Sequence, residues 1–105
     1  MPPNALYLVA YVFGGAILTN GIPHFISGLM GRKFPSPFAK PPGKGLSSAT
    51  VNLLWGFANL VVSYLLLCRV GAFDLRAPAE AAAFGAGILL MSVFAARHFG
   101  RFNAG

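Results

Sequence analysis

The sequence predicts an all-α integral membrane protein with three transmembrane helices. Hydrophobic residues make up 56% of the 105 residues, and charged residues only 10%, against a usual charged share of about 25%. Three long apolar runs are separated by two more polar segments. A soluble chain of this length would expose far too much apolar surface, so the bilayer is its expected solvent. The length suits one transmembrane domain covering residues 1–105.

The first apolar run, residues 5–30, predicts a long first helix. Its 26 residues would measure roughly 39 Å at about 1.5 Å per residue. The hydrocarbon core is only about 30 Å thick, so tilt or a kink is expected. Pro23 has no N–H and crowds the carbonyl of Thr19, while Gly21 loosens the same turn. We expect a proline-kinked helix with an outer part ending near Asn20 and an inner part starting at His24.

The segment 31–48 is too polar and proline-rich to continue that helix, and its prolines favour an extended or polyproline-like path. Ser47 or Ser48 is suited to cap a second helix at 49–70. Pro78 suits the first turn of a third helix at 78–99. The connection 71–77 is short, which predicts that the second and third helices are antiparallel neighbours.

The distribution of basic residues predicts the orientation. Six of the eight Lys and Arg residues lie in the 31–48 loop or near the C-terminal end, whereas Arg69 and Arg76 lie on the other side with both acidic residues. The positive-inside rule then puts the N-terminus outside and the C-terminus in the cytoplasm of a multi-pass inner-membrane protein. All three tyrosines fall near the outer end, as expected for an interfacial belt: Tyr7, Tyr11 and Tyr64.

The same charges predict the partner. The net charge is +6, but the basic residues gather at the ends of the apolar runs, so we expect anionic lipid headgroups rather than nucleic acid. The residues expected to contact those headgroups are Arg32, Lys33, Lys40 and Lys44. Cys68 is the single cysteine, which excludes a disulfide within this sequence and a cysteine metal cluster.

Small and polar residues recur along one face of each helix. The second helix has Asn52, Gly56, Asn59 and Ser63 at helical spacing. The first has Asn20, His24, Ser27 and Gly31, beside the series Gly14, Gly21 and Gly28. The third has the weaker series Gly85, Ser92, Ala96 and Gly100. Since Asn20 and Asn59 have matching depths, we expect a hydrogen bond between them.

These faces allow two interpretations. In the first, the polar groups only hold the helices together, a common packing device in membranes. In the second, a broken helix and converging polar groups form a binding pocket. Its residues would be Asn20, His24, Asn52 and Asn59, with Trp55 as an aromatic wall.

Cofactor and enzyme functions receive less support. His24 and His98 on different helices raise the question of haem, but a helix C-terminus favours a cationic His98, the opposite of a ligand. We therefore expect no cofactor. The sequence has no carboxylate pair, no nucleophile with a base beside it and no metal triad, so an enzyme is not expected. The first helix also lacks the glutamate found in small multidrug transporters.

Two sequence strings carry a resemblance. N-G-I-P-H-F at 20–25 and F-P-x-P-F…P-P-G-K-G-L-S-S at 34–48 resemble those of small bacterial inner-membrane proteins with no assigned activity. The resemblance covers mostly residues 20–59 and implies a membrane location. The favoured function is a small structural or accessory subunit that packs through helix faces, as a homo-oligomer or in a larger membrane complex. The alternative is a small-molecule or lipid-binding carrier with a pocket near the kink.

Overall fold

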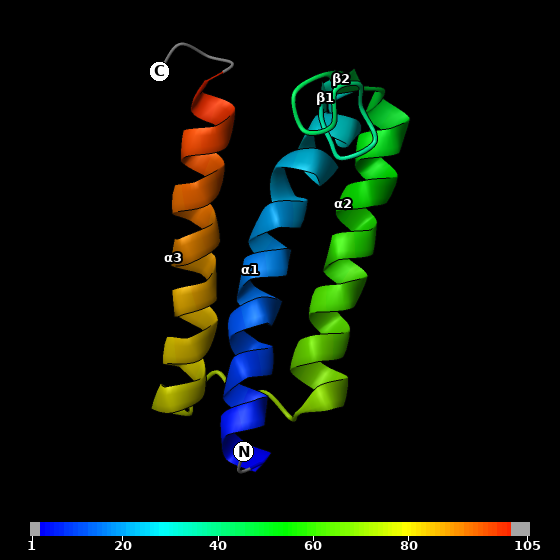
Figure 1. The fold of residues 1–105 in the computed structure, drawn as a ribbon. Helices are drawn as coiled ribbons and strands as arrows, with labels where there is room; N and C mark the ends of the chain where they lie inside the picture. Colours follow the sequence, from blue (N-terminus) through cyan, green and yellow to red (C-terminus); the bar gives the residue numbers. More distant parts are fainter. Residues whose placement is uncertain (1–2, 102–105) are drawn as a thin grey trace.

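The computed structural model describes residues 3–101, and in them the three expected helices run side by side (Figure 1). α1 spans Pro3–Leu29, α2 spans Ala49–Tyr64 and α3 spans Pro78–Gly100. α2 continues into a π-helical segment, η1, at Leu65–Val70. The apolar stretches are 26, 22 and 23 residues long, each enough to cross a membrane. By length and composition, the three helices therefore suit a multi-pass membrane protein.

Local sequence explains where the helices begin. The Ser48 hydroxyl accepts a hydrogen bond from the backbone N–H of Val51 at 3.1 Å, which caps α2. Pro78 occupies the first turn of α3, where its missing N–H has no helical partner to lose. Pro23 lies inside α1, which is one continuous helix rather than two helical parts.

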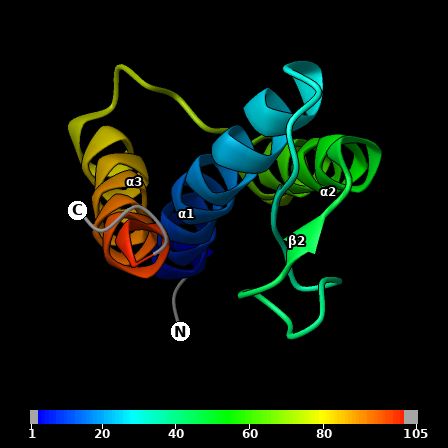
Figure 2. The ribbon, with the colours of Figure 1, turned by 90° about the horizontal axis from the view of Figure 1, so that it is seen from above.

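α1 lies between α2 and α3, as the two perpendicular views show (Figures 1 and 2). α1 packs against both of the other helices. The expectation that the second and third helices are neighbours was therefore wrong, although they do run antiparallel. The reason is that the 71–77 connection carries the chain past the end of α1 before α3 begins.

Glycines set the close contact between α1 and α3. A Cβ on Gly15 would overlap the backbone carbonyl of Phe84, and one on Gly87 would overlap that of Val12. Gly87 is the buried residue of α3. The face predicted for this helix was wrong, because Gly85 is exposed and has open space where a Cβ would lie.

The face predicted for the second helix is confirmed. The buried residues of α2 are Asn52, Gly56, Asn59 and Ser63. On the facing side of α1, a Cβ on Gly21 would lie 2.8 Å from the Cβ of Asn59. A Cβ on Gly28 would lie 2.6 Å from the Cβ of Leu53. Small residues therefore let the two backbones approach closely.

The 31–48 loop is more compact than the extended path expected from its prolines. β1 (Phe34–Pro35) pairs antiparallel with β2 (Leu46–Ser47), as a two-residue ladder. The buried Ser36 hydroxyl is hydrogen-bonded to that of Ser47, and the backbone N–H of Gly43 donates to the carbonyl of Ser36 at 2.7 Å. These bonds fold the loop back over the ends of α1 and α2 (Figure 1).

The outer surface of the bundle is apolar. Leu54, Leu89 and Leu90 each expose more than 60% of their surface, as side chains facing lipid do. Tyr11 behaves differently from the belt residue that was expected, because only 2% of it is exposed. Its ring packs edge-on against Phe73, with centroids 5.1 Å apart.

Candidate binding cleft

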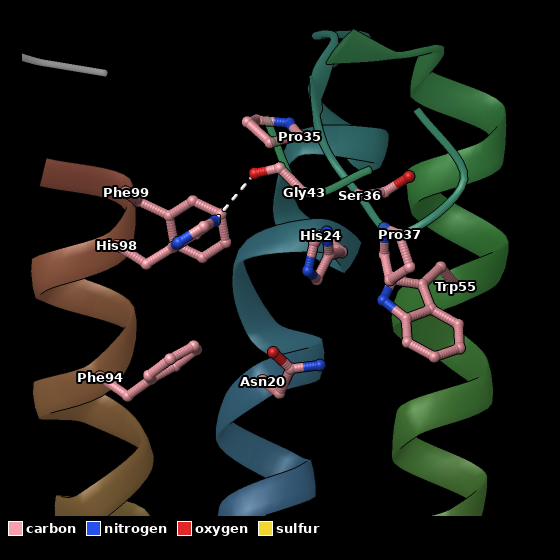
Figure 3. Close-up of a pocket in the computed structure, with 10 residues that line it drawn as sticks. All are labelled: Asn20, His24, Pro35, Ser36, Pro37, Gly43, Trp55, Phe94, His98 and Phe99. Carbon is pink, nitrogen blue, oxygen red and sulfur yellow. Dashed lines mark hydrogen bonds between the residues drawn. The ribbon is translucent and has the colours of Figure 1, made fainter. Parts of the chain in front are cut away.

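A cleft of about 210 Å³ opens where the loop meets the three helices (Figure 3). Three of the five residues predicted for a ligand site lie along it, namely Asn20, His24 and Trp55. The remaining lining residues come from the loop and from α3: Pro35, Ser36, Pro37, Gly43, Phe94, His98 and Phe99. The other two predicted residues, Asn52 and Asn59, lie behind this wall and support it.

Backbone carbonyls fix the orientation of His24 through Asn52. The Asn52 side chain is fully buried. Its Nδ2 donates to the carbonyls of Phe34 at 2.9 Å, Ser47 at 3.2 Å and Ser48 at 3.1 Å. Because a carbonyl can only accept, the amide cannot be flipped, and its Oδ1 accepts from Nδ1 of His24 at 2.8 Å. In the neutral imidazole, Nε2 of His24 is therefore an acceptor.

A second set of hydrogen bonds, through Asn59, fixes the orientation of the Asn20 side chain in the same way. Nδ2 of Asn59 donates to the carbonyl of Trp55 at 2.8 Å, so its Oδ1 is the acceptor. This oxygen accepts from Nδ2 of Asn20 at 3.1 Å, which is the hydrogen bond expected from the matching depths. Oδ1 of Asn20 then remains as an acceptor, and Figure 3 shows it on the side of the cleft toward α3.

Trp55 adds a donor to these acceptors. Within residues 3–101, its Nε1 is the buried side-chain polar atom that has no hydrogen-bond partner. Leaving such a group unpaired costs about 1–3 kcal/mol. The indole lines the cleft, with its nitrogen on the side nearer His24 (Figure 3). The ring of Phe38, a loop residue, packs edge-on against the indole at 5.2 Å.

Aromatic rings enclose His24 on its other sides. The rings of Phe34 and Phe99 lie edge-on to the imidazole, with centroids 5.4 Å and 6.0 Å away. Phe34 is partly covered by this contact. The sequence could not have revealed Phe94 or Phe99 as cleft residues, because they reach it only when α3 packs beside α1.

His98 connects α3 to the loop. Its Nε2 lies 2.8 Å from the carbonyl of Gly43 (Figure 3), so this nitrogen donates and is not placed as a metal ligand. Its ring also stacks on Phe94, with an interplanar angle of 6°. In the described part of the chain, no group of three or more His, Cys, Asp or Glu side chains is arranged for a metal ion. The geometry therefore gives the haem interpretation no support.

The four residues predicted to contact lipid headgroups lie outside the cleft. Arg32, Lys33, Lys40 and Lys44 are all exposed at the loop end of the bundle. They are placed where headgroups could reach them if the bundle spans a bilayer.

No protein-family model, curated protein sequence or solved structure matches this chain. Function therefore has to be inferred from the cleft itself. The cleft offers two oriented acceptors, one buried donor and several aromatic edges. Such a set suits the binding of a small polar group inside an otherwise apolar wall.

Proposed function

We propose that the protein binds a small molecule or a lipid in the cleft beside His24. The observation that carries the proposal is the unpaired Nε1–H of Trp55 in a cleft that also contains two acceptors held by backbone carbonyls. Packing alone gives no reason to keep a buried donor unpaired, because that donor destabilises the fold. A ligand oxygen that accepts from it would remove this cost.

The proposed orientation is N-terminus outside and C-terminus in the cytoplasm of the inner membrane. The loop and the C-terminal end of α3 lie at one end of the bundle (Figure 1), and this end holds six of the eight basic residues. The 71–77 connection lies at the other end. This separation of charge supports the positive-inside arrangement, with the cleft near the cytoplasmic face.

Cysteine labelling tests the orientation. In a Cys68→Ser background, Pro42→Cys and Ala72→Cys variants, both at exposed positions, are treated from outside with an impermeant thiol reagent. Labelling at position 72 and not at 42 is expected. The reverse pattern would show that the topology is inverted.

We also propose that α1 bends near the cleft. Pro23 has no N–H to donate to the carbonyl of Thr19. The Thr19 hydroxyl donates to the carbonyl of Gly15 at 2.9 Å, a type of bond that often bends helices. A bend at this level would widen the space beside His24, the residue that follows Pro23.

The binding function is tested by purification in mild detergent followed by native mass spectrometry. We expect a small molecule or lipid to be retained at a fixed stoichiometry and to be lost in His24→Phe, which keeps an aromatic ring but removes the acceptor. Leu54→Ala is the matched control, because Leu54 is 62% exposed and does not line the cleft. Equal retention by both variants would contradict the proposed site.

A small structural or accessory subunit is the second candidate. It is favoured by α3, in which Gly87 is the buried residue and large side chains such as Leu89 and Leu90 are exposed. A second copy of the chain or a larger membrane complex would cover this surface in place of lipid. In the same purification, a protein partner that is lost in a Leu89→Ala, Leu90→Ala variant but retained in His24→Phe would favour this candidate.

A further inference from the structure

Two apolar hollows lie in line between α1 and α2, beginning at Trp55. A hollow of about 250 Å³ shares Trp55 with the cleft. A larger hollow of about 460 Å³ shares Ile17 and Val62 with the first one. We call these two hollows the α1–α2 groove. Apart from Asn59, all its lining residues are apolar or aromatic.

The length of the groove suits a lipid chain. It extends from Trp55 to Val70 along α2 and η1, which is about 20 Å at about 1.5 Å per residue. The groove is longer than the roughly 15 Å that one leaflet contributes to the hydrocarbon core, because Val70 ends η1 at the opposite end of α2 from the loop. A polar site at one end and an apolar groove of this length match an amphiphile with one long, extended chain.

The cleft also restricts the chemistry of the head group. Nε2 of the neutral His24 ring and Oδ1 of Asn20 are acceptors, so they need a donor from the ligand. Nε1–H of Trp55 needs an acceptor. A hydroxyl group provides both a donor and an acceptor. A carboxylate, or a phosphate dianion, has no proton to donate, so its oxygens would be repelled by the lone pairs of the His24 and Asn20 acceptors. An ester without a hydroxyl would leave both acceptors unpaired.

We infer that the cleft and the α1–α2 groove bind a neutral amphiphile with a hydroxyl-bearing head group and a single apolar chain. This inference rests on the proposed binding function and names its ligand class. The hydroxyl donates to His24 or Asn20 and accepts from Trp55, and the chain follows the groove past Val62. Because Nε1 of Trp55 is buried, the exposed loop residues Pro37 and Phe38 have to shift for the ligand oxygen to reach it.

An anionic amphiphile is the main competing ligand, because the side chains around the cleft mouth are positively charged. Lys44 follows the cleft residue Gly43, and Arg97 precedes His98. Both are exposed cations, which attract negatively charged head groups. An anionic chain would therefore gather near the mouth, even though the acceptors inside disfavour it.

Trp55 provides the readout, because it is the single tryptophan. The full chain is placed in nanodiscs of a zwitterionic lipid, and ligands with a brominated chain are added, since bromine quenches a nearby indole. The probes share one chain and differ in the head: a monoacylglycerol, the ionised fatty acid and its methyl ester. We expect saturable quenching by the monoacylglycerol at a concentration about tenfold lower than by the others, the effect of one or two net hydrogen bonds.

Two variants test the groove separately from the cleft. Val62→Phe fills the groove, and Val61→Phe is the control, because Val61 is similarly exposed (40% against 42%) but does not line the groove. Saturable quenching should weaken at least threefold in Val62→Phe only. His24→Phe should weaken the preference for the monoacylglycerol, and Val62→Phe keeps the test decisive if His24→Phe fails to fold.

The outcomes separate this inference from the binding function. If the ionised fatty acid binds as well as the monoacylglycerol, the head-group class is wrong, but the cleft still binds a lipid. If all three probes quench without saturation, or if both valine variants respond equally, only bulk lipid is being detected and the inference fails. A molecule that co-purifies with the wild type and is lost in His24→Phe would then still support the binding function.

Discussion

The two interfaces of α1 are built differently. Toward α2, side-chain hydrogen bonds cross the interface: Asn20 to Asn59, His24 to Asn52, and Ser63 to the carbonyl of Gly14 at 2.8 Å. Toward α3, the backbones approach at Gly15 and Gly87, and aromatic rings fill the space at the loop end.

The difference explains how the cleft is organised. Hydrogen bonds are directional, so they fix both the register and the rotation of α2 against α1. Glycines let two helix backbones approach closely but make no directional bond. The acceptors of the cleft belong to the α1–α2 side, where their orientation is fixed. α3 supplies Phe94 and Phe99 as apolar lining of the cleft.

The largest effect on stability is expected from Asn52→Leu. The substitution removes a fully buried amide that joins His24 to three backbone carbonyls of the loop. Leaving buried groups unpaired costs about 1–3 kcal/mol each, so we expect a loss of about 3 kcal/mol in the free energy of unfolding. Reversible unfolding in mixed micelles with increasing SDS measures it.

The control for that prediction is Thr50→Val, two residues away in the first turn of α2, where Thr50 is exposed. A change within about 0.5 kcal/mol is expected there. The loop of the Asn52→Leu protein should also become more sensitive to protease. If Asn52→Leu unfolds at the same SDS fraction as Thr50→Val, the backbone relay does not stabilise the loop.

The next largest effect is expected from Gly87→Ala at the other interface. The new Cβ would overlap the carbonyl of Val12, and neither backbone can move without separating the helices. Overpacking of this kind costs about 1–3 kcal/mol. Gly85→Ala is the matched control in the same helix, because open space surrounds that position. SDS unfolding should show destabilisation by Gly87→Ala only, because alanine by itself favours a helix over glycine. A similar loss in both variants would mean that the contact with Val12 is not responsible.

These glycines also show why sequence reasoning worked on one interface and not on the other. The face of α2 was found because Asn52, Asn59 and Ser63 are polar residues in an apolar helix, and polar groups have to turn away from lipid. In α3, no comparable polar residue indicated whether the face with Gly85 or the face with Gly87 is buried. Lipid and protein interior are equally apolar, so hydrophobic periodicity does not distinguish the two sides of this helix.

The candidate site was predictable to the same extent. Asn20 and His24 were identified because they are polar residues on either side of the expected helix break at Pro23, and Trp55 was proposed as an aromatic wall beside them. The loop wall was not, because Ser36 and Gly43 reach the cleft only through the short pairing of β1 with β2. Asn52 supports that pairing, because its side-chain amide donates hydrogen bonds to a backbone carbonyl of each strand. Such long-range contacts leave no periodic signal in the sequence.

A smaller effect is expected at Asn20 and Asn59, whose side chains are 3.1 Å apart. A double-mutant cycle with Asn20→Leu and Asn59→Leu should give a coupling energy of about 0.5–1.5 kcal/mol, since membrane hydrogen bonds between helices contribute this amount. Resistance to SDS is again the measurement. Strictly additive losses would show that the bond does not stabilise the interface.

The smallest effect is expected at Ser63, and it tests whether a single hydroxyl contributes to holding α1 against α2. Ser63→Ala removes the bond to the carbonyl of Gly14, and a loss of about 0.6 kcal/mol is expected, the typical value for such a bond in a membrane protein. Thr19→Ala is the comparison, because the Thr19 hydroxyl bonds within its own helix, to the carbonyl of Gly15. It should therefore leave the association of α1 with α2 unchanged. SDS titration of both variants distinguishes the two cases: equal losses would mean that bonds between helices contribute no more than bonds within one, and that the fixed register of α1 against α2 comes from glycine contacts instead.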